Sequence, residues 1–202
     1  MWNRLRTYFR PPPIASAHAL RTFLEERAAL IAQKCAIDYC RGKTGLASYA
    51  LFSEKSFIDA LDICRWETFA AVLGDLLILT EGHLRPQAAA EQHSGLCDAL
   101  IGLYSAALAA LPVPAHRAGG WRDAQDGFAR RFAAASQGKP RHVLEVADHS
   151  AKRLFETLPI HASYRKLDEE VVYGAVRFRM IAVSAEMQRR FAAPELVRQL
   201  LA

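Results

Sequence analysis

Two stretches of this 202-residue chain place charged side chains between the apolar ridges of an expected helix. The arrangement appears when successive residues of the segments 16–40 and 163–191 are turned by about 100° each. Asp168 also lies between the ridges, and the candidates for a site among these charged residues are Arg27, Lys34, Asp38, Arg179 and Glu186. If these faces are buried, a guanidinium there needs a carboxylate partner or an anionic ligand. The two strips are therefore the first candidates for a binding site.

Asp75 is another charged residue in apolar surroundings, because it is the only charge in the run FAAVLGDLLIL at 69–79. A buried carboxylate either contacts a cation or takes up a proton. His93 lies on the apolar side of the next expected helix, together with Leu96 and Leu100. Its position fits a hydrogen-bonded core histidine, and it also fits a ligand or proton-transfer group that faces the same cavity as Asp75.

These residues allow two interpretations within one chain. In the favoured one, Asp75 pairs with Arg179 or Arg27 across the core, and the strips are internal salt bridges that set the register of the helices. In the other, the strips face a shared cavity in which Arg27, Lys34 and Arg179 bind an anionic ligand. An interface with another chain is the third alternative. No spacing among these residues identifies a ligand or a cofactor.

Other groups of polar residues do not define a reaction. His142, Glu145 and His149 have a spacing that could bind a metal, but the same helix side carries Asp148 and Lys152 and is typical of a solvated face. We therefore expect no metal site. The chain also lacks the G-x-S-x-G, P-loop and dinucleotide-binding motifs. The common hydrolytic and nucleotide-using folds are disfavoured, and whether the protein is an enzyme stays open.

The first ten residues, MWNRLRTYFR, form an arm with an apolar side and a basic side when they are projected as a helix. The residues expected to make contacts are Trp2, Arg4, Leu5, Arg6, Phe9 and Arg10. So short a helix is not stable alone in water. The arm therefore needs a surface, which could be the body of the chain, a protein partner or an anionic membrane. Three prolines at 11–13 separate it from the next helix.

Composition and charge indicate a globular protein. The chain is 51% hydrophobic and 23% charged. Its net charge of +5 includes +3 from the arginines of the arm, which leaves 23 basic and 21 acidic residues at positions 11–202. This near balance makes nucleic acid an unlikely partner. Four cysteines in apolar helical segments, without C-x-x-C spacing or a secretory signal, favour a cytoplasmic location, with peripheral membrane contact as an option for the arm.

Helical periodicity runs along the rest of the chain and predicts an all-α protein. We expect an irregular bundle of about six or seven helices, at 16–40, 53–84, 87–111, 121–135, 140–158, 163–191 and from 194 onward. The helices at 53–84, 87–111 and 163–191 should be central. Small residues at 95, 99, 102 and 106 should admit a neighbouring backbone. The arm and its Pro-rich linker occupy 1–15, and a single all-helical domain occupies 16–202.

Two functions fit these expectations. The first is a non-catalytic binding or adaptor protein whose amphipathic arm docks on a protein partner, on a second copy of the chain or on an anionic membrane surface. The alternative is a protein that binds a small anionic molecule, or an enzyme, that uses the charged strips inside the bundle.

Overall fold

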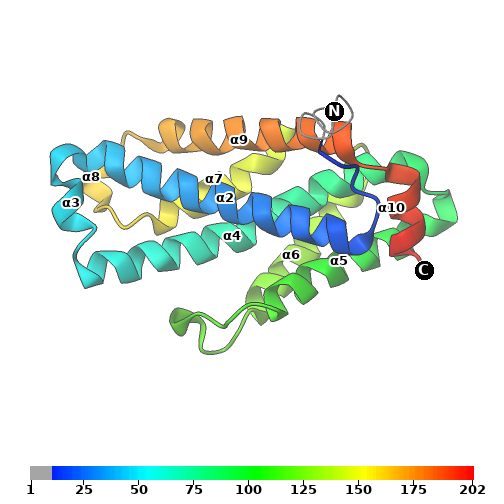
Figure 1. Cartoon of the computed structure of the whole chain (residues 1–202), viewed down its shortest axis with the longest axis horizontal. Coiled ribbons are helices and arrows are strands. Elements are labelled where there is room, and N and C mark those ends of the chain that lie inside the picture. Colours follow the sequence, from blue (N-terminus) through cyan, green and yellow to red (C-terminus); the bar gives the residue numbers. More distant parts are fainter. Residues whose placement is uncertain (1–10) are drawn as a thin grey trace, which may run out of the picture.

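The structure is a bundle of α-helices (Figure 1). This computed structural model describes residues 11–202, and within that range the only strand-type pairing is one bridge between Ile14 and Phe191. The helices of eight residues or more are α2 (Ala17–Thr44), α4 (Lys55–Leu84), α5 (His93–Ala109), α6 (Arg122–Ser136), α7 (Val143–Thr157), α9 (Glu169–Arg190) and α10 (Ala193–Leu200). Two four-residue helices, α3 (Ser48–Leu51) and α8 (Ala162–Arg165), lie in the connections. The prediction of an all-α bundle is confirmed.

The ends of the helices follow the local sequence. α2 begins after Ser16, whose hydroxyl accepts a hydrogen bond from the N–H of Ala19 at 3.1 Å. It ends before Gly45, whose φ of 52° is a value that glycine adopts more easily than other residues. α5 begins at His93 and not at the predicted residue 87, because the residues after α4 form 3₁₀ turns at 85–87 and 90–92. α9 begins later than residue 163 because α8 forms a separate turn.

Two groups of helices share α4. In the first group, α2 packs against α4 and α9, and α7 packs against the same two helices, so that the four form a ring. In the second group, α5 and α6 pack against each other and against α4. Helix α10 covers one end, where it contacts α2, α4 and α5 (Figure 1). Helix α4 therefore has more neighbours than any single face could accommodate.

The middle of α4 is buried on every side as a result. Every residue from Glu67 to Glu81 is buried, which is typical of a helix that passes through the core. This stretch includes three carboxylates, because Glu67, Asp75 and Glu81 are only 6%, 0% and 3% exposed. Carboxylates are seldom buried without a partner. The partners of these three side chains show where the polar chemistry of the core lies.

Of the three helices expected to be central, only α4 is surrounded. In α5, the expected close approach of a backbone is absent at Gly102, where an added Cβ would have no heavy atom within 4 Å among the described residues. In α9, Val171 and Phe178 belong to an expected core ridge but are 65% and 73% exposed. The periodicity of α9 contains two apolar ridges and does not show which one faces α2 and α7. The buried ridge is the other one, which consists of Val172, Val176, Met180, Val183 and Met187.

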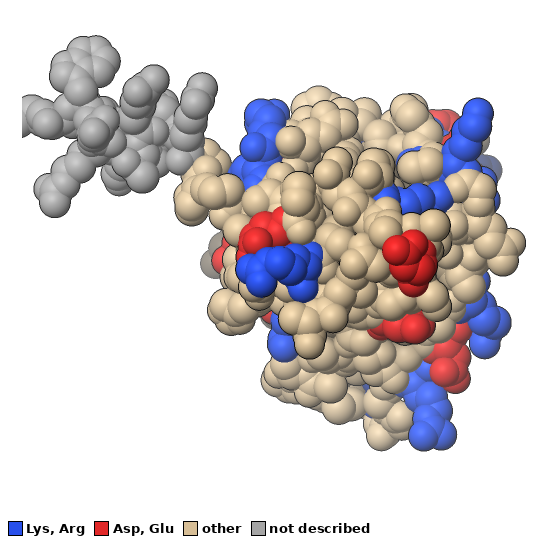
Figure 2. All heavy atoms as spheres, turned by 90° about the vertical axis from the view of Figure 1, so that its right-hand side faces the viewer, with Lys and Arg blue, Asp and Glu red and all other residues tan. Residues whose placement is uncertain are grey.

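The start of the described chain is fixed to the end of α9. The N–H of Ile14 donates to the carbonyl of Arg190 at 2.7 Å, and the N–H of Ala192 donates to the carbonyl of Ile14 at 3.0 Å. Ile14 is buried in the core, two residues before the expected start of the helical domain. The end of the molecule that carries α10 shows charged groups of both signs between larger uncharged areas (Figure 2). Among residues 11–202, no helix combines the length and the apolar character needed to cross a membrane.

Candidate functional site

The charged strips of α2 and α9 face each other and form ion pairs. Arg27 donates two hydrogen bonds to Glu186, from Nε at 2.8 Å and from Nη2 at 2.9 Å. Glu186 also accepts a hydrogen bond from Arg190 at 2.6 Å. The hydrogen bonds from Arg27 are the main reason why the pKa of Glu186 lies below its usual range. This end of the two strips is a carboxylate held between two guanidinium groups.

The remaining members of the strips pair around Asp38. Arg179 Nη2 donates to Asp38 Oδ2 at 2.9 Å, and Lys34 Nζ lies 3.4 Å from Asp38 Oδ1. A pocket of about 210 Å³ lies beside Asp38 and Arg179, and most of its other lining residues are apolar. The three cations of the strips thus bind two different carboxylates. This geometry agrees with the interpretation of the strips as salt bridges between helices.

Asp75 lies apart from both strips, and its expected pairing with Arg179 or Arg27 is wrong. Arg131 of α6 donates through Nη1 to Asp75 Oδ1, and the N–H of Ser150 on α7 donates to Oδ2 at 3.1 Å. His149 Nδ1 lies 3.5 Å from Oδ1. The reason is the position of Asp75 on α4, where it faces α6 and α7, whereas the strips lie at the contact between α2 and α9.

A second buried carboxylate of α4, Glu67, binds two guanidinium groups and an imidazole. Glu67 accepts hydrogen bonds from Nε and Nη2 of Arg117, the second at 2.7 Å, from Nε2 of His116 at 2.9 Å, and from Nη2 of Arg153 on α7. Burial alone would raise the pKa of Glu67, but the hydrogen bonds from these groups outweigh it and lower the pKa to about 2. Glu67 is therefore ionised at neutral pH, and its four oxygen lone-pair positions are all used.

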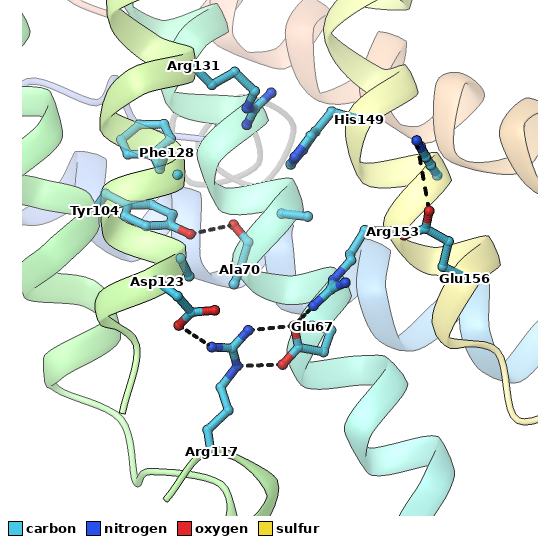
Figure 3. A pocket seen from close by; sticks show the side chains of 14 residues that line it. Glu67, Ala70, Tyr104, Arg117, Asp123, Phe128, Arg131, His149, Arg153 and Glu156 are labelled. Carbon is cyan, nitrogen blue, oxygen red and sulfur yellow. Dashed lines mark hydrogen bonds and ion pairs between the residues drawn. The ribbon is translucent and has the colours of Figure 1, made fainter. Parts of the chain in front are cut away.

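Between Glu67 and Arg131, the arginine that binds Asp75, lies a pocket of about 370 Å³ (Figure 3). Small residues of α4, Ala70 and Ala71, line it between the two carboxylates. Tyr104 and Phe128 line another part as a stacked aromatic pair, with ring centroids 4.1 Å apart and an interplanar angle of 27°. The hydroxyl of Tyr104 donates to the carbonyl of Ala70 at 3.2 Å, which holds the ring against α4. The pocket thus combines an aromatic side with a charged side.

The charged side of the pocket has unused donors on two fixed guanidinium groups, and its two exposed carboxylates, Asp123 and Glu156, pair with Arg117 and Lys152. Within residues 11–202, Arg131 uses only Nη1, and Arg153 only Nη2, for hydrogen bonds to protein acceptors. His149 and Lys152 also line the pocket and are about half and two-thirds exposed, respectively. The buried acceptors, in contrast, are already occupied by the ion pairs described above. A ligand that brings acceptor oxygens would complete this arrangement.

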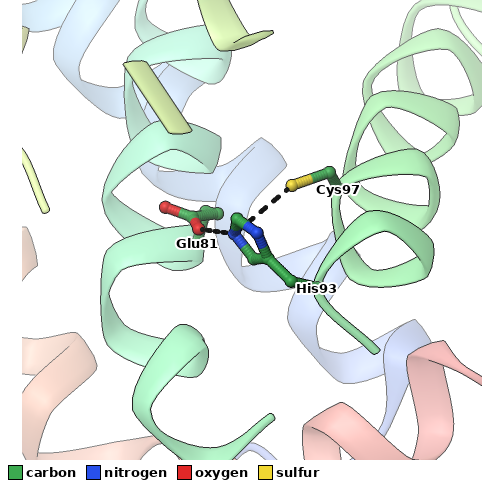
Figure 4. A group of neighbouring side chains, drawn as sticks. All are labelled: Glu81, His93 and Cys97. Carbon is green, nitrogen blue, oxygen red and sulfur yellow. Dashed lines mark hydrogen bonds and ion pairs between the residues drawn. The ribbon is translucent and has the colours of Figure 1, made fainter. Parts of the chain in front are cut away.

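His93 contacts a different carboxylate from the one expected. Its Nε2 lies 2.8 Å from Glu81 Oε1 and 3.7 Å from the Sγ of Cys97 (Figure 4). Glu81 follows Asp75 by six residues, a rise of about 9 Å along α4. His93 is not among the residues that line the pocket beside Asp75. The structure therefore separates two residues that the sequence placed at one cavity.

The pattern of the sequence singled out Asp75 but not the residues around it. Arg131 carries a signal of the same kind as Arg179, because it lies next to Phe132 and three positions after Phe128 on the apolar side of its helix. Glu67 lies eight positions before Asp75 and so shares a side of the helix, about 80° away. Arg117 and Arg153 have no such signal, since Arg117 lies in a three-residue 3₁₀ turn and Arg153 lies on a helix side that resembles a solvated face.

The expected contact residues of the arm, Trp2 to Arg10, lie outside the described residues.

Comparisons of the chain with models of protein families, with curated protein sequences and with solved structures give no match. Function therefore has to be argued from the geometry of the pocket.

Proposed function

We propose that this protein binds a small anionic molecule in the pocket between α4, α5, α6 and α7. The observation that carries the proposal is the pair of guanidinium groups, Arg131 and Arg153, that line this pocket, are each fixed by a buried carboxylate and keep N–H donors without a protein acceptor. Asp75 orients Arg131, and Glu67 orients Arg153, so that both guanidinium groups are held in place before a ligand arrives. Preorganised guanidinium groups suit carboxylate and phosphate oxygens, which they can bind through two parallel hydrogen bonds.

The aromatic side of the pocket supports a ligand that also has a planar apolar part. Tyr104 and Phe128 are 3% and 4% exposed, so their positions are fixed by packing. A volume of about 370 Å³ lies at the lower end of the range for small-molecule sites. An aromatic carboxylate or phosphate monoester would place its ring against the stacked pair and its oxygens near Arg131 and Arg153.

The proposal is for binding and not for acid–base catalysis by the buried carboxylates. Glu67 has a pKa of about 2 and four hydrogen bonds, so it does not exchange a proton near neutral pH. Asp75 is held by a guanidinium and by the N–H of Ser150. A general base needs a free acceptor position within reach of the proton that it removes. Glu67 offers none, and Asp75 is 0% exposed and does not line the pocket, so a ligand there does not reach it.

Calorimetric titration with three small probes tests this proposal. Phenyl phosphate carries both features that the pocket recognises, inorganic phosphate carries only the anion, and phenol carries only the ring. We expect phenyl phosphate to bind most tightly, inorganic phosphate more weakly, and phenol not measurably. Removal of one charged donor with Arg153→Gln should weaken phenyl phosphate binding about tenfold or more. This variant should fold, because Arg153 is 40% exposed and Arg117 still binds Glu67.

Arg177→Gln is the matched control. Arg177 is also an arginine paired with carboxylates, Asp148 and Glu170, but it does not line the pocket. The substitution Arg177→Gln should leave the affinity for phenyl phosphate unchanged. If both variants weaken the binding of phenyl phosphate equally, the effect is one of net charge and the pocket is not the site. If neither phenyl phosphate nor inorganic phosphate shows saturable binding, the proposal is refuted. Native mass spectrometry of the freshly purified protein would show whether a ligand is retained from the cell.

The arm-dependent partner or membrane binding stays a prediction, since residues 1–10 lie outside the described part of the chain. Comparison of the full chain with a variant that lacks residues 1–13, in a liposome co-sedimentation assay, tests it separately from the pocket.

A further inference from the structure

A second polar cluster lies at the end of α4, away from the pocket. It consists of Glu81 on α4 and of His93 and Cys97, which are four residues apart on α5 (Figure 4). One carboxylate oxygen, one imidazole nitrogen and one sulfur atom lie within 4.8 Å of one another. The imidazole of His93 is one-third exposed and Cys97 is partly exposed, so that solvent can reach the cluster.

A catalytic relay does not account for this geometry. In a Cys–His–acid triad, the acid and the thiol contact different nitrogens of the imidazole ring. Here the same nitrogen, Nε2 of His93, is 2.8 Å from Glu81 Oε1 and 3.7 Å from Cys97 Sγ. Burial also raises the pKa of the Cys97 thiol, which makes it less nucleophilic than an ordinary surface thiol. The three side chains point at a common place rather than along a chain of proton transfers.

Convergence of one nitrogen, one sulfur and one oxygen is the donor set of a transition-metal site. We propose that Glu81, His93 and Cys97 bind a zinc ion, with a fourth position open to solvent. Zinc accepts these three ligand types in tetrahedral sites, and sites with three protein ligands leave one position for water or another molecule. The helix supplies the spacing, because residues four apart lie on the same side.

Two of the three ligand–ligand distances can be compared directly with those of such an ion, and the third, between Glu81 and Cys97, lies within 4.8 Å and has to reach about 3.6 Å. Tetrahedral zinc with its usual bond lengths separates a nitrogen and a sulfur ligand by about 3.6 Å, close to the 3.7 Å between His93 Nε2 and Cys97 Sγ. The nitrogen and oxygen ligands would need about 3.4 Å, so the present 2.8 Å contact of His93 with Glu81 has to open by a few tenths of an ångström. Rotation of the partly exposed imidazole provides this movement.

The protons and charges of the binding step balance. His93 binds through Nε2, so this nitrogen gives up to solvent the proton that it now donates to Glu81 while Nδ1 takes one up, and Cys97 loses its thiol proton to solvent. The thiolate and the carboxylate of Glu81 together match the charge of the ion. Arg85 fixes the carboxylate of Glu81 through hydrogen bonds of 2.6 Å from Nε and 2.7 Å from Nη2. It orients this ligand, and its positive charge lowers the affinity for the cation.

Titration of the chelator-treated full chain with Co²⁺ tests the site directly. Cobalt takes the place of zinc and shows a charge-transfer absorption in the near ultraviolet when a thiolate binds it. We expect one equivalent of Co²⁺ to produce this band and one equivalent of Zn²⁺ to remove it. Cys97→Ser should abolish the band and weaken Co²⁺ binding at least tenfold. Loss of a residue that only hydrogen-bonds to a metal ligand already weakens metal binding about tenfold, and Cys97 is a ligand itself. His93→Gln should weaken binding to a similar extent.

Two variants serve as controls. Cys35→Ala removes a thiol that is 3% exposed in the core, and His18→Gln removes an exposed histidine of α2. Both should keep the full band with one equivalent of Co²⁺, and circular dichroism should confirm that all four variants are helical. Binding without a thiolate band would place the ion elsewhere and overturn the proposal, as would a band that survives Cys97→Ser. Absence of saturable Co²⁺ binding would overturn it as well.

Discussion

Substitution of Gly74 by alanine should destabilise the protein, although alanine is the better helix former. Gly74 lies next to Asp75 on α4, at the point where α6 approaches most closely. A Cβ added there would lie 2.9 Å from Cδ2 of Phe128 and 2.9 Å from Nη2 of Arg131. The ring of Phe128 cannot easily move away, because it stacks on Tyr104 and lies 5.3 Å from the ring of Phe132.

The expected size follows from two opposing terms. Alanine in place of glycine inside a helix stabilises the folded state by about 1 kcal/mol. Insertion of a methyl group into a closely packed contact costs about 1 to 3 kcal/mol. The net effect of Gly74→Ala should therefore be a loss of up to about 2 kcal/mol in the free energy of unfolding. Gly102→Ala is the control, because Gly102 is in a helix and has open space around it, so that only the gain of up to about 1 kcal/mol applies.

Urea denaturation followed by circular dichroism measures both variants against the unsubstituted protein. We expect the midpoint of Gly74→Ala to fall and that of Gly102→Ala to rise, with similar slopes. In thermal melts the two variants should differ by several degrees, because about 1 kcal/mol corresponds to about 2–4 °C in a chain of this size. If Gly74→Ala is as stable as Gly102→Ala, α6 does not approach α4 at this residue, and the packing argument for the position of Arg131 fails.

Three further changes have expected outcomes. Glu67 has a pKa of about 2 in the folded state and about 4.5 in the unfolded chain, so its stabilising contribution of up to about 3 kcal/mol is complete above pH 4.5 and is lost as the pH falls toward 2. Glu67→Gln should flatten this acid limb in pH-dependent unfolding. Arg27→Met should cost only about 1 kcal/mol or less in urea denaturation, because the pair with Glu186 is partly exposed, and a loss above about 3 kcal/mol would contradict this. In the native protein, a thiol reagent should modify Cys97 before the three buried cysteines, whereas all four should react in denaturant.

The helical fold was accessible from the sequence because the periodicity of α2, α4 and α9 extends over many turns. The arrangement of those helices was not. A projection shows that α9 has two apolar ridges, but the choice between Val171 and Val172 as the buried side depends on where α2 and α7 lie. This is information about neighbours, which no single helix contains.

The pocket shows the same limit at the level of side chains. Asp75 was recognised because it is a lone charge in an apolar run. Its partner Arg131 is 56 residues away, and Arg153 lies 86 residues from Glu67. Many arginines of the chain have similar local surroundings, so nothing local selects these two. Buried carboxylates can thus be detected from the pattern, whereas their partners require the packing of α6 and α7 on α4.

The burial of α4 on all sides also has a consequence for the order of events in folding. The helix is complete by residue 84, but the cations that neutralise Glu67 and Asp75 come from residues 116 to 153. During synthesis from the N-terminus, a chain that ends before residue 116 would carry both carboxylates without these partners, and one that ends before α7 would still lack Arg153, the N–H of Ser150 and the apolar side of α7 that packs on α4. Stable tertiary structure should therefore form late, when α7 reaches α4, and until then the nascent chain exposes part of the apolar surface of α4 to the cell's chaperones.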